Sequence, residues 1–251
     1  MRSSLALRCA ATAYAALVVL HLVALLAGAE EVADVSQWLL MPALAAVLAA
    51  ATRWPRGHTV TWALVALGFS WVGDTLPSFV PDDSAFLAMV GGFLLAQTAY
   101  VVAFAPSVRS SVAVRRPLAL VGYGVVLVGL VGLCAPHAGS LLVPVAVYGG
   151  MLTAMAVLST GLGRVAGIGG AVFLVSDALI ALDAFVPGWA LPGQSVWVMA
   201  TYCAGQALLV LGIVRHNRAR RRAPEAAPVG VQRPKVDNVV ALIASRPNAI
   251  V

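Results

Sequence analysis

The sequence predicts an all-α protein that crosses a membrane several times, and three observations support this. Of its 251 residues, 61% are hydrophobic and only 10% are charged, whereas soluble domains carry about 25% charged residues. The hydrophobic residues form runs long enough to cross the bilayer core as helices, which takes about 17–25 residues. Charge, Pro and Gly interrupt these runs. The chain therefore reads as one polytopic membrane helix bundle.

Eight such runs follow one another along the chain. The first follows Arg2 and Arg8 and ends in LAGAE, which resembles a signal cleavage site. It is longer than the apolar part of a secretory signal, about 7–15 residues, so we expect it to remain as a helix. The eight expected spans are residues 5–28, 36–52, 59–79, 84–105, 117–135, 140–160, 165–186 and 195–214.

The charges between the spans predict the orientation. All sixteen Lys and Arg residues fall within the first eight residues, after the last span, or in the loops that follow spans two, four and six. The opposite loops carry Glu30, Glu31, Asp34, Asp82 and Asp83 and no Lys or Arg. Basic loops stay in the cytoplasm. We therefore expect both termini to be cytoplasmic, in a multi-pass protein of the cell membrane.

The basic balance of the chain, +6 at neutral pH, is thus explained by topology, and we expect no nucleic-acid partner. Residues 1–214 are expected to form the transmembrane domain. Residues 215–251 are basic and Pro-rich, and we expect a disordered cytoplasmic tail there. Membrane lipids are the expected surroundings, and the sequence leaves the oligomeric state open.

Two aspartates lie within apolar spans. Asp74 occurs in GFSWVGDTLPSF and Asp177 in GGAVFLVSDALIALDAF. A charge at membrane depth costs at least about 2.5 kcal/mol, so such residues usually face a protein interior or a water-filled cavity. At 1.5 Å per residue, both lie roughly 18–22 Å from the cytoplasmic end of their spans. Asp183, six residues after Asp177, is expected on another face near the outer interface.

Other polar side chains are expected at a similar depth on neighbouring spans. Taken singly, such residues often only join membrane helices by hydrogen bonds. Together they predict one water-accessible pocket in the outer half of the bundle. The set comprises Ser70, Gln97, Tyr100, Tyr148, Ser176, Tyr202 and Gln206.

Two carboxyl groups at one depth, with no Lys or Arg in the spans to neutralise them, indicate acid–base chemistry. A carboxyl group that keeps its proton beside one that ionises is the arrangement used by general acid–base catalysts. The four His residues show no helical metal-ligand spacing, and the chain has no GxSxG or Gly-rich phosphate motif. We therefore expect neither a metal nor a cofactor.

Several motifs, in order, resemble the YhhN family of eight-span membrane proteins, which includes the lysoplasmalogenases. They are ALGFSWVGDTLPSF with the Phe/Gly-rich start of the next span, LLVPVAVYGGMLTAM, GGAVFLVSDALIAL and TYCAGQALLVLGI, within residues 35–214. The chain departs from the family at Met41, where Lys is frequent, and at Gln97, where His is common.

The resemblance implies that the chain hydrolyses the vinyl ether bond of a lysoplasmalogen or a related lysophospholipid to a fatty aldehyde and a glycerophospho-base. Such hydrolysis passes through an oxocarbenium-like ion, which carboxylate pairs handle in glycosidases. One of Asp74 and Asp177 would donate the proton, and the other would stabilise the cation and activate water. Which of the two donates the proton stays open. The residues expected to orient substrate or water are Tyr148, Tyr202, Gln206, Gln97, Tyr100 and Ser176.

Two other functions remain open at this point. A proton- or cation-coupled transporter of small solutes would also place two carboxyl groups in its spans. A non-catalytic scaffold that binds lipids would tolerate the replacement of both aspartates.

Overall fold

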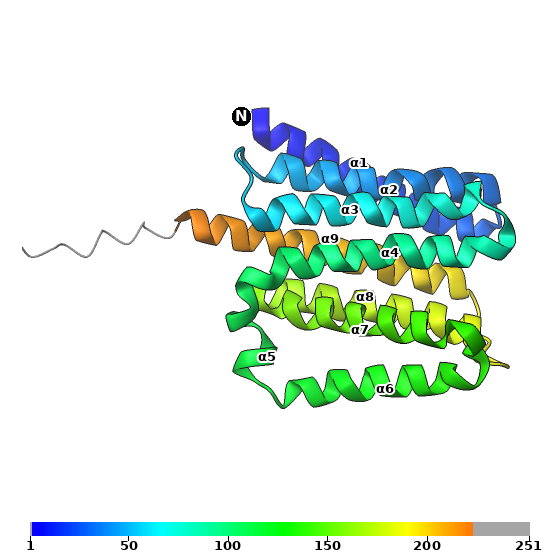
Figure 1. Ribbon diagram of the computed structural model, residues 1–251. Helices are drawn as coiled ribbons and strands as arrows, with labels where there is room; N and C mark the ends of the chain where they lie inside the picture. The colour runs from blue at the N-terminus through cyan, green and yellow to red at the C-terminus, as the bar shows by residue number, and fades with distance from the viewer. Residues whose placement is uncertain (1, 223–251) are drawn as a thin grey trace, which may run out of the picture. The chain divides into compact units, whose positions relative to one another are not determined.

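The structure is a bundle of long helices joined by short connections (Figure 1). The computed structural model describes residues 2–222, with side chains from residue 5 onward. Its long helices are α1 (Arg2–Ala27), α2 (Glu30–Ala51), α3 (His58–Thr75), α4 (Asp82–Phe104), α6 (Ala119–Ala138), α7 (Leu142–Ser159), α8 (Arg164–Phe185) and α9 (Gln194–Arg222). The short elements are η1 (Leu76–Phe79), η2 (Ala105–Ser110), α5 (Val112–Arg115), η3 (Gly139–Leu141) and η4 (Thr160–Leu162).

Charged residues at the helix ends fit the helix dipole. Glu30 and Glu31 occupy the first turn of α2, Asp82 and Asp83 occupy the first turn of α4, and a basic run, Arg220–Arg222, closes α9. Negative charge at a helix N-terminus and positive charge at its C-terminus are both stabilising. The loop charges that predicted the topology therefore also help to define where these helices begin and end.

Within residues 2–222, six helical segments are long and apolar enough to cross a membrane. One of them, Ala119–Leu162, contains both α6 and α7, while α3 is not among the six. Within residues 2–222 the chain forms no strand. The protein is therefore an all-α, multi-pass membrane bundle. The expected boundaries are close to the observed ones for most helices, but α2 begins at Glu30 and not at residue 36, and α9 continues beyond residue 214 to Arg222. The rest of the predicted tail lies outside the described residues.

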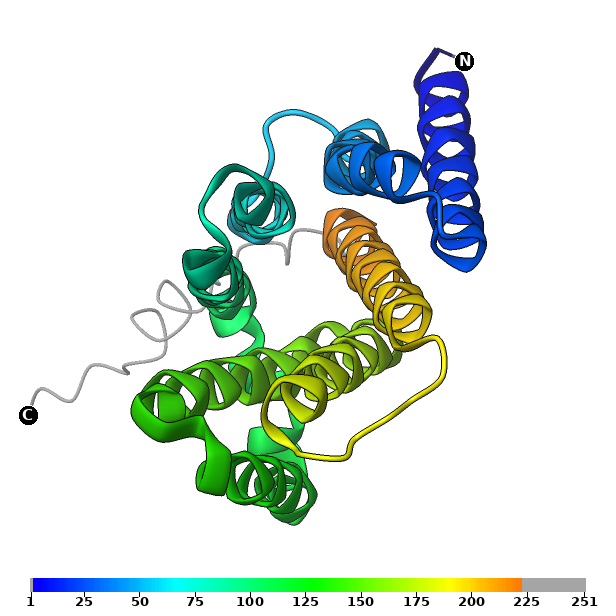
Figure 2. The same ribbon diagram turned by 90° about the vertical axis from the view of Figure 1, so that its right-hand side faces the viewer.

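The helices pack side by side, with α1 at one edge and α6 at the other (Figures 1 and 2). In the end-on view, α9 lies on the inner side of α2 and against α8 (Figure 2). The outward face of α6 carries large exposed apolar side chains, such as Val121, Val125 and Val128. Apolar side chains that face lipid are expected on a membrane bundle, because lipid tails are as apolar as they are.

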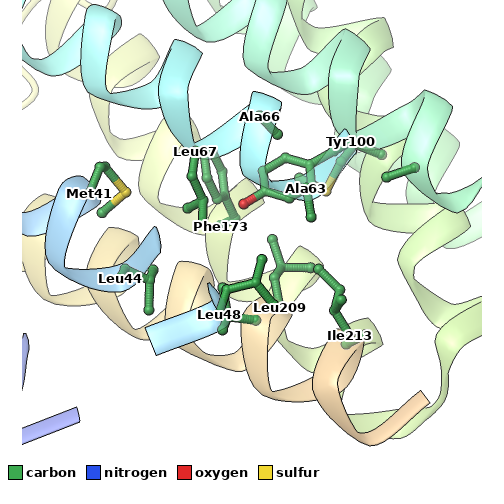
Figure 3. Packing of buried hydrophobic residues seen from close by; sticks show 14 of the residues in the cluster. Met41, Leu44, Leu48, Ala63, Ala66, Leu67, Tyr100, Phe173, Leu209 and Ile213 are labelled. Atoms are coloured by element: carbon green, nitrogen blue, oxygen red, sulfur yellow. The ribbon is translucent and has the colours of Figure 1, made fainter. Parts of the chain in front are cut away.

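One hydrophobic core draws buried residues from seven of the described helices, α1, α2, α3, α4, α7, α8 and α9, and Figure 3 shows part of it. The ring of Tyr100 from α4 is fully buried and stacks on Phe104, with ring centroids 5.5 Å apart. The other labelled side chains of this core are Met41, Leu44 and Leu48 from α2, Ala63, Ala66 and Leu67 from α3, Phe173 from α8, and Leu209 and Ile213 from α9.

Small residues let α8 and α9 approach closely. A Cβ atom built on Gly169 would lie 2.7 Å from the backbone nitrogen of Leu209, and one on Gly205 would lie 2.9 Å from that of Phe173. Helices α3 and α4 meet in the same way, since a Cβ atom on Gly92 would lie 2.6 Å from the Cα atom of Gly73. Membrane helices pack through such small residues because dispersion contacts drive their association. These contacts fix the helices that carry Asp74, Asp177 and Tyr202.

We predict that Gly205→Ala lowers the melting temperature of the protein in detergent, although Ala is the better helix former by about 1 kcal/mol. The added methyl group would press on the backbone of Phe173, and such overpacking costs about 1–3 kcal/mol. Thermal unfolding followed by intrinsic fluorescence would measure the change. The matched control is Gly124→Ala on α6, where the new methyl group meets no atom within 4 Å. Equal melting temperatures for the two variants would contradict the close contact.

Candidate active site

Each membrane aspartate is held by a tyrosine from another helix. The Tyr202 hydroxyl on α9 donates a hydrogen bond to Asp74 Oδ2 on α3, at 2.8 Å. The Tyr148 hydroxyl on α7 donates one to Asp177 Oδ2 on α8, at 2.5 Å. Asp74 is 6% exposed and Asp177 is 9% exposed. Buried carboxyl groups need such partners, because an unpaired polar group in a low dielectric is costly.

A second layer of hydrogen bonds lies behind Asp74. The Tyr100 hydroxyl donates to Gln206 Oε1 at 2.6 Å, and Gln206 Nε2 donates to Ser70 Oγ at 3.0 Å. Ser70 precedes Asp74 by one turn of α3, and Gln206 follows Tyr202 by one turn of α9. Residues four apart lie on the same helix face. The two helices are therefore joined at two successive turns, which fixes the direction of the Tyr202 hydroxyl.

Aromatic rings enclose Tyr202 on both sides. Its ring meets Phe93 of α4 and Phe173 of α8 edge to face, with centroids 5.6 and 5.5 Å away. Such arrangements are favourable beyond the area that they bury. The ring of Tyr202 thus has little freedom, and its hydroxyl stays on Asp74.

The two carboxyl groups open into the same polar cavity, which has a volume of about 690 Å³. Asp34 and Asp183 also line this cavity, and its lining includes no Lys or Arg. The cavity therefore presents four carboxyl groups at the junction of α2, α3, α8 and α9, where a polar molecule can reach the two that are buried.

Gln97 lies next to Tyr148 but outside the hydrogen-bonded pairs. Its side chain is fully buried on α4. Its amide lies beside the Tyr148 hydroxyl, but neither amide atom makes a hydrogen bond of normal geometry with another residue that the structure describes. Buried amides are rarely without a partner. Gln97 does not line the polar cavity, so this amide faces the protein interior.

The expected set of polar residues is divided between two layers. Asp74, Asp177, Ser176 and Tyr202 line the polar cavity, although the Ser176 hydroxyl is occupied by the backbone oxygen of Val198 at 2.9 Å. The rest of the set does not line this cavity, so the expectation of one pocket that gathers all of them was too broad. Tyr148 reaches the cavity through Asp177. The members that lie in the protein interior are Ser70, Gln97, Tyr100 and Gln206.

Sequence reasoning missed several residues of the cavity. Asp34 was placed in a loop and Asp183 on another face, but both line the cavity. Gln37 also lines it, and its amide reaches the backbone oxygen of Asp74 at 3.5 Å. Asp34, Gln37 and Trp38 are spaced i, i+3, i+4, which marks one helix face. This spacing could have indicated that the three residues share a helix face. That inference requires α2 to begin at Glu30, whereas the span was expected to begin at residue 36.

The arrangement offers carboxyl chemistry in a cavity that a polar molecule can enter. Among residues 5–222, no three His, Cys, Asp or Glu side chains are placed to hold a metal ion. The described groups next to the two carboxyls are hydroxyls and amides, which orient a proton donor or a water molecule without competing for a proton at neutral pH.

Comparison with known proteins identifies the family. The sequence profile of the YhhN family matches residues 32–213, a range that contains both membrane aspartates and their tyrosines. The chain belongs to the YhhN family. A protein of Mycobacterium bovis named lysoplasmalogenase is 32% identical over 186 residues, which cover 69% of this chain and 70% of that protein.

Two further relatives carry the same name. A lysoplasmalogenase of Mycobacterium tuberculosis shows the same identity and coverage. A lysoplasmalogenase of Rattus norvegicus is 35% identical over 162 residues, which cover 63% of this chain and 64% of the rat protein. No solved structure matches the chain significantly.

We predict that Gln206→Leu destabilises the protein by about 1–3 kcal/mol, because it leaves the Tyr100 and Ser70 hydroxyls buried without this partner. Tyr100→Phe should lower the free energy of unfolding less in the Gln206→Leu background than in the wild type, because the Tyr100 hydroxyl then no longer has Gln206 as its hydrogen-bond partner. A double-mutant cycle on thermal unfolding would measure this coupling.

The matched control for that cycle is Thr98→Val, which removes an exposed hydroxyl that bonds only within α4. We expect it to change stability little and to be additive with Gln206→Leu. Additive effects for Tyr100→Phe and Gln206→Leu would show that the network behind Asp74 does not act as a unit.

Proposed function

We propose that the protein is an integral-membrane hydrolase that cleaves the vinyl ether bond of lysoplasmalogens, or of a closely related lysolipid. Its relatives named lysoplasmalogenase support the substrate class. The observation that carries the proposal is the pair of buried aspartates, each held by a tyrosine, that face one polar cavity. A YhhN-family fold that served only as a scaffold has no evident need for two such carboxyl groups.

The reaction begins with the transfer of a proton from a carboxylic acid to a carbon atom. One of Asp74 and Asp177 transfers its proton to the second carbon of the vinyl ether, while an oxygen lone pair forms a double bond to the first carbon. The resulting oxocarbenium ion carries a positive charge, which the other, ionised aspartate stabilises. Glycosidases use a pair of carboxyl groups for the same kind of charge.

Water then completes the reaction. The ionised aspartate takes a proton from a water molecule as the water attacks the first carbon, which gives a hemiacetal. The hemiacetal collapses to a fatty aldehyde and the free glycerol hydroxyl. One aspartate has lost a proton and the other has gained one, so a proton passes between them through the polar cavity that they share, and the site is restored.

The tyrosines and amides serve as orienting groups in this proposal. Tyr202 and Tyr148 aim the two carboxyl groups, because each donates to one carboxyl oxygen and leaves the other oxygen for the reaction. Gln97 is buried beside Tyr148 and acts through that tyrosine. Gln206, Tyr100 and Ser176 also act indirectly, since their hydrogen bonds hold α3, α4, α8 and α9 in register.

We predict that Asp74→Asn and Asp177→Asn each lower kcat at least ~100-fold, because a general acid or base contributes about 10²–10⁴-fold. The measurement is aldehyde release from a lysoplasmalogen by the purified full-length protein in detergent. The control is Asp82→Asn in the first turn of α4, an exposed residue that does not line the polar cavity.

Turnover that survives in either membrane variant would exclude the two-aspartate mechanism. Solute flux in proteoliposomes that depends on these residues, without any aldehyde, would instead favour the transporter. No effect of either variant on either assay would favour the lipid-binding scaffold.

We further propose that all eight long helices cross the cell membrane, with both termini in the cytoplasm. The segment Ala119–Leu162 has 44 residues, which at 1.5 Å per residue would span about 66 Å, roughly twice the hydrocarbon core. It therefore suits two crossings, α6 and α7. With α3 counted, basic connections then alternate with connections that carry no Lys or Arg along the whole bundle. In this proposal residues 1–214 form the membrane domain and residues 215–251 the cytoplasmic tail.

We predict that a membrane-impermeant maleimide labels Ser84→Cys but not Ser110→Cys in intact cells, in a background without Cys9, Cys134 and Cys203. Both serines are exposed in the structure, and they flank α4 on the acidic and basic sides respectively. Labelling of both after permeabilisation is the control. Labelling of Ser110→Cys in intact cells would reverse the proposed orientation.

A further inference from the structure

A second, narrow cavity lies next to the polar one, between α4, α6, α7 and α8. Its volume is about 60 Å³, and every residue that lines it is apolar except Tyr148 and Asp177. It follows α8 from Asp177 to Phe185, about 12 Å or two helical turns. We refer to it below as the apolar slot.

The two cavities meet at Asp177. Met89, Phe93, Asp177 and Ile180 line both of them. Asp74, by contrast, lines only the polar cavity. If one molecule occupies both cavities, the junction between the polar and the apolar part of that molecule must therefore lie next to the carboxyl group of Asp177.

The shapes and linings of the two cavities specify an amphiphile with one chain. The polar cavity is roomy, at about 690 Å³, and rich in carboxyl and amide groups, whereas the apolar slot is narrow. Apolar cavities stay dry and accept hydrocarbon ligands. Leu87, which lines the slot, is 50% exposed on the outer surface of α4, so the slot reaches the face of the bundle that meets lipid tails.

We propose that the apolar slot holds the hydrocarbon chain of a single-chain lipid whose glycerol and head group occupy the polar cavity. The bond that joins chain and glycerol then lies at Asp177. The chemistry at that bond rests on the function proposed above, but the binding mode does not depend on it. A lipid with two chains fits poorly in this binding mode, because the apolar slot is narrow and takes one chain.

The binding mode can be tested without turnover. The probes are two non-hydrolysable lysolipids with a saturated ether bond, one carrying a photoreactive diazirine at the start of the chain and the other near its end. After illumination of the full-length protein in nanodiscs, mass spectrometry locates the labels. We expect the first probe to label Tyr148 or Leu152, and the second probe to label Phe86 or Leu130, which lie further along the slot.

A matched pair of variants gives the specificity test. Ala181→Phe on α8 fills the slot and should lower labelling of its lining at least tenfold. It should also lower, at least tenfold, the ratio of kcat/KM for long-chain over short-chain alkenyl substrates. Ala184→Phe adds the same bulk to the exposed face of the same helix and should change neither quantity. If Ala181→Phe fails to fold, Ala181→Leu replaces it, and the two wild-type labelling patterns remain a test by themselves.

The outcomes separate this inference from the proposed function. Labels confined to lipid-facing residues such as Val125 and Val128, and insensitive to Ala181→Phe, would overturn the slot even if aldehyde is released. Slot labelling that depends on Ala181, without aldehyde release from any alkenyl lysolipid, would support the binding mode and reject the proposed reaction. Equal labelling by a two-chain probe would overturn the single-chain specificity.

Discussion

The arrangement of this bundle depends on how two carboxyl groups are accommodated at membrane depth. A carboxyl group without a partner in hydrocarbon is too costly to keep, so its helix must lie where another helix supplies a hydrogen bond or where water enters. Both solutions are present together. Tyr202 and Tyr148 supply the hydrogen bonds, and the polar cavity supplies access for water. Together these requirements fix which face of α3, α7, α8 and α9 points inward.

Close helix packing makes those hydrogen bonds possible. A phenol hydroxyl reaches a carboxylate on another helix only if the two backbones are correctly spaced. Gly170 sets that spacing between α8 and α7, which carries Tyr148, because the Cβ of a larger residue would lie 2.9 Å from the Cα atom of Ala156. The edge-to-face contacts of Tyr202 with Phe93 and Phe173 then hold the ring in place. Backbone packing and side-chain chemistry are therefore not separable in this protein.

The two aspartates have similar partners but different surroundings. Asp74 is backed by the network of Tyr202, Gln206 and Ser70 and faces only the polar cavity. Asp177 is held by Tyr148 and borders both the polar cavity and the apolar slot. The substrate of the proposed reaction is a lipid with a polar end, an apolar end and the reactive bond between them. A site with one carboxyl group at the boundary and another on the polar side matches that order.

The amino-acid sequence was enough to predict the all-α membrane class, the approximate helices and the two aspartates, because hydrocarbon demands long apolar runs and makes any carboxyl group in them exceptional. It also indicated Tyr148, Tyr202 and Gln206, whose position along the helices can be counted. The packing of the helices was needed to learn which tyrosine pairs with which aspartate, that Tyr100 and Gln206 lie behind the cavity, and that Asp34 and Asp183 line it. The reason is physical. Depth in the bilayer follows from position in the chain, but the rotation of each helix and the choice of its neighbours follow from packing between residues far apart in sequence.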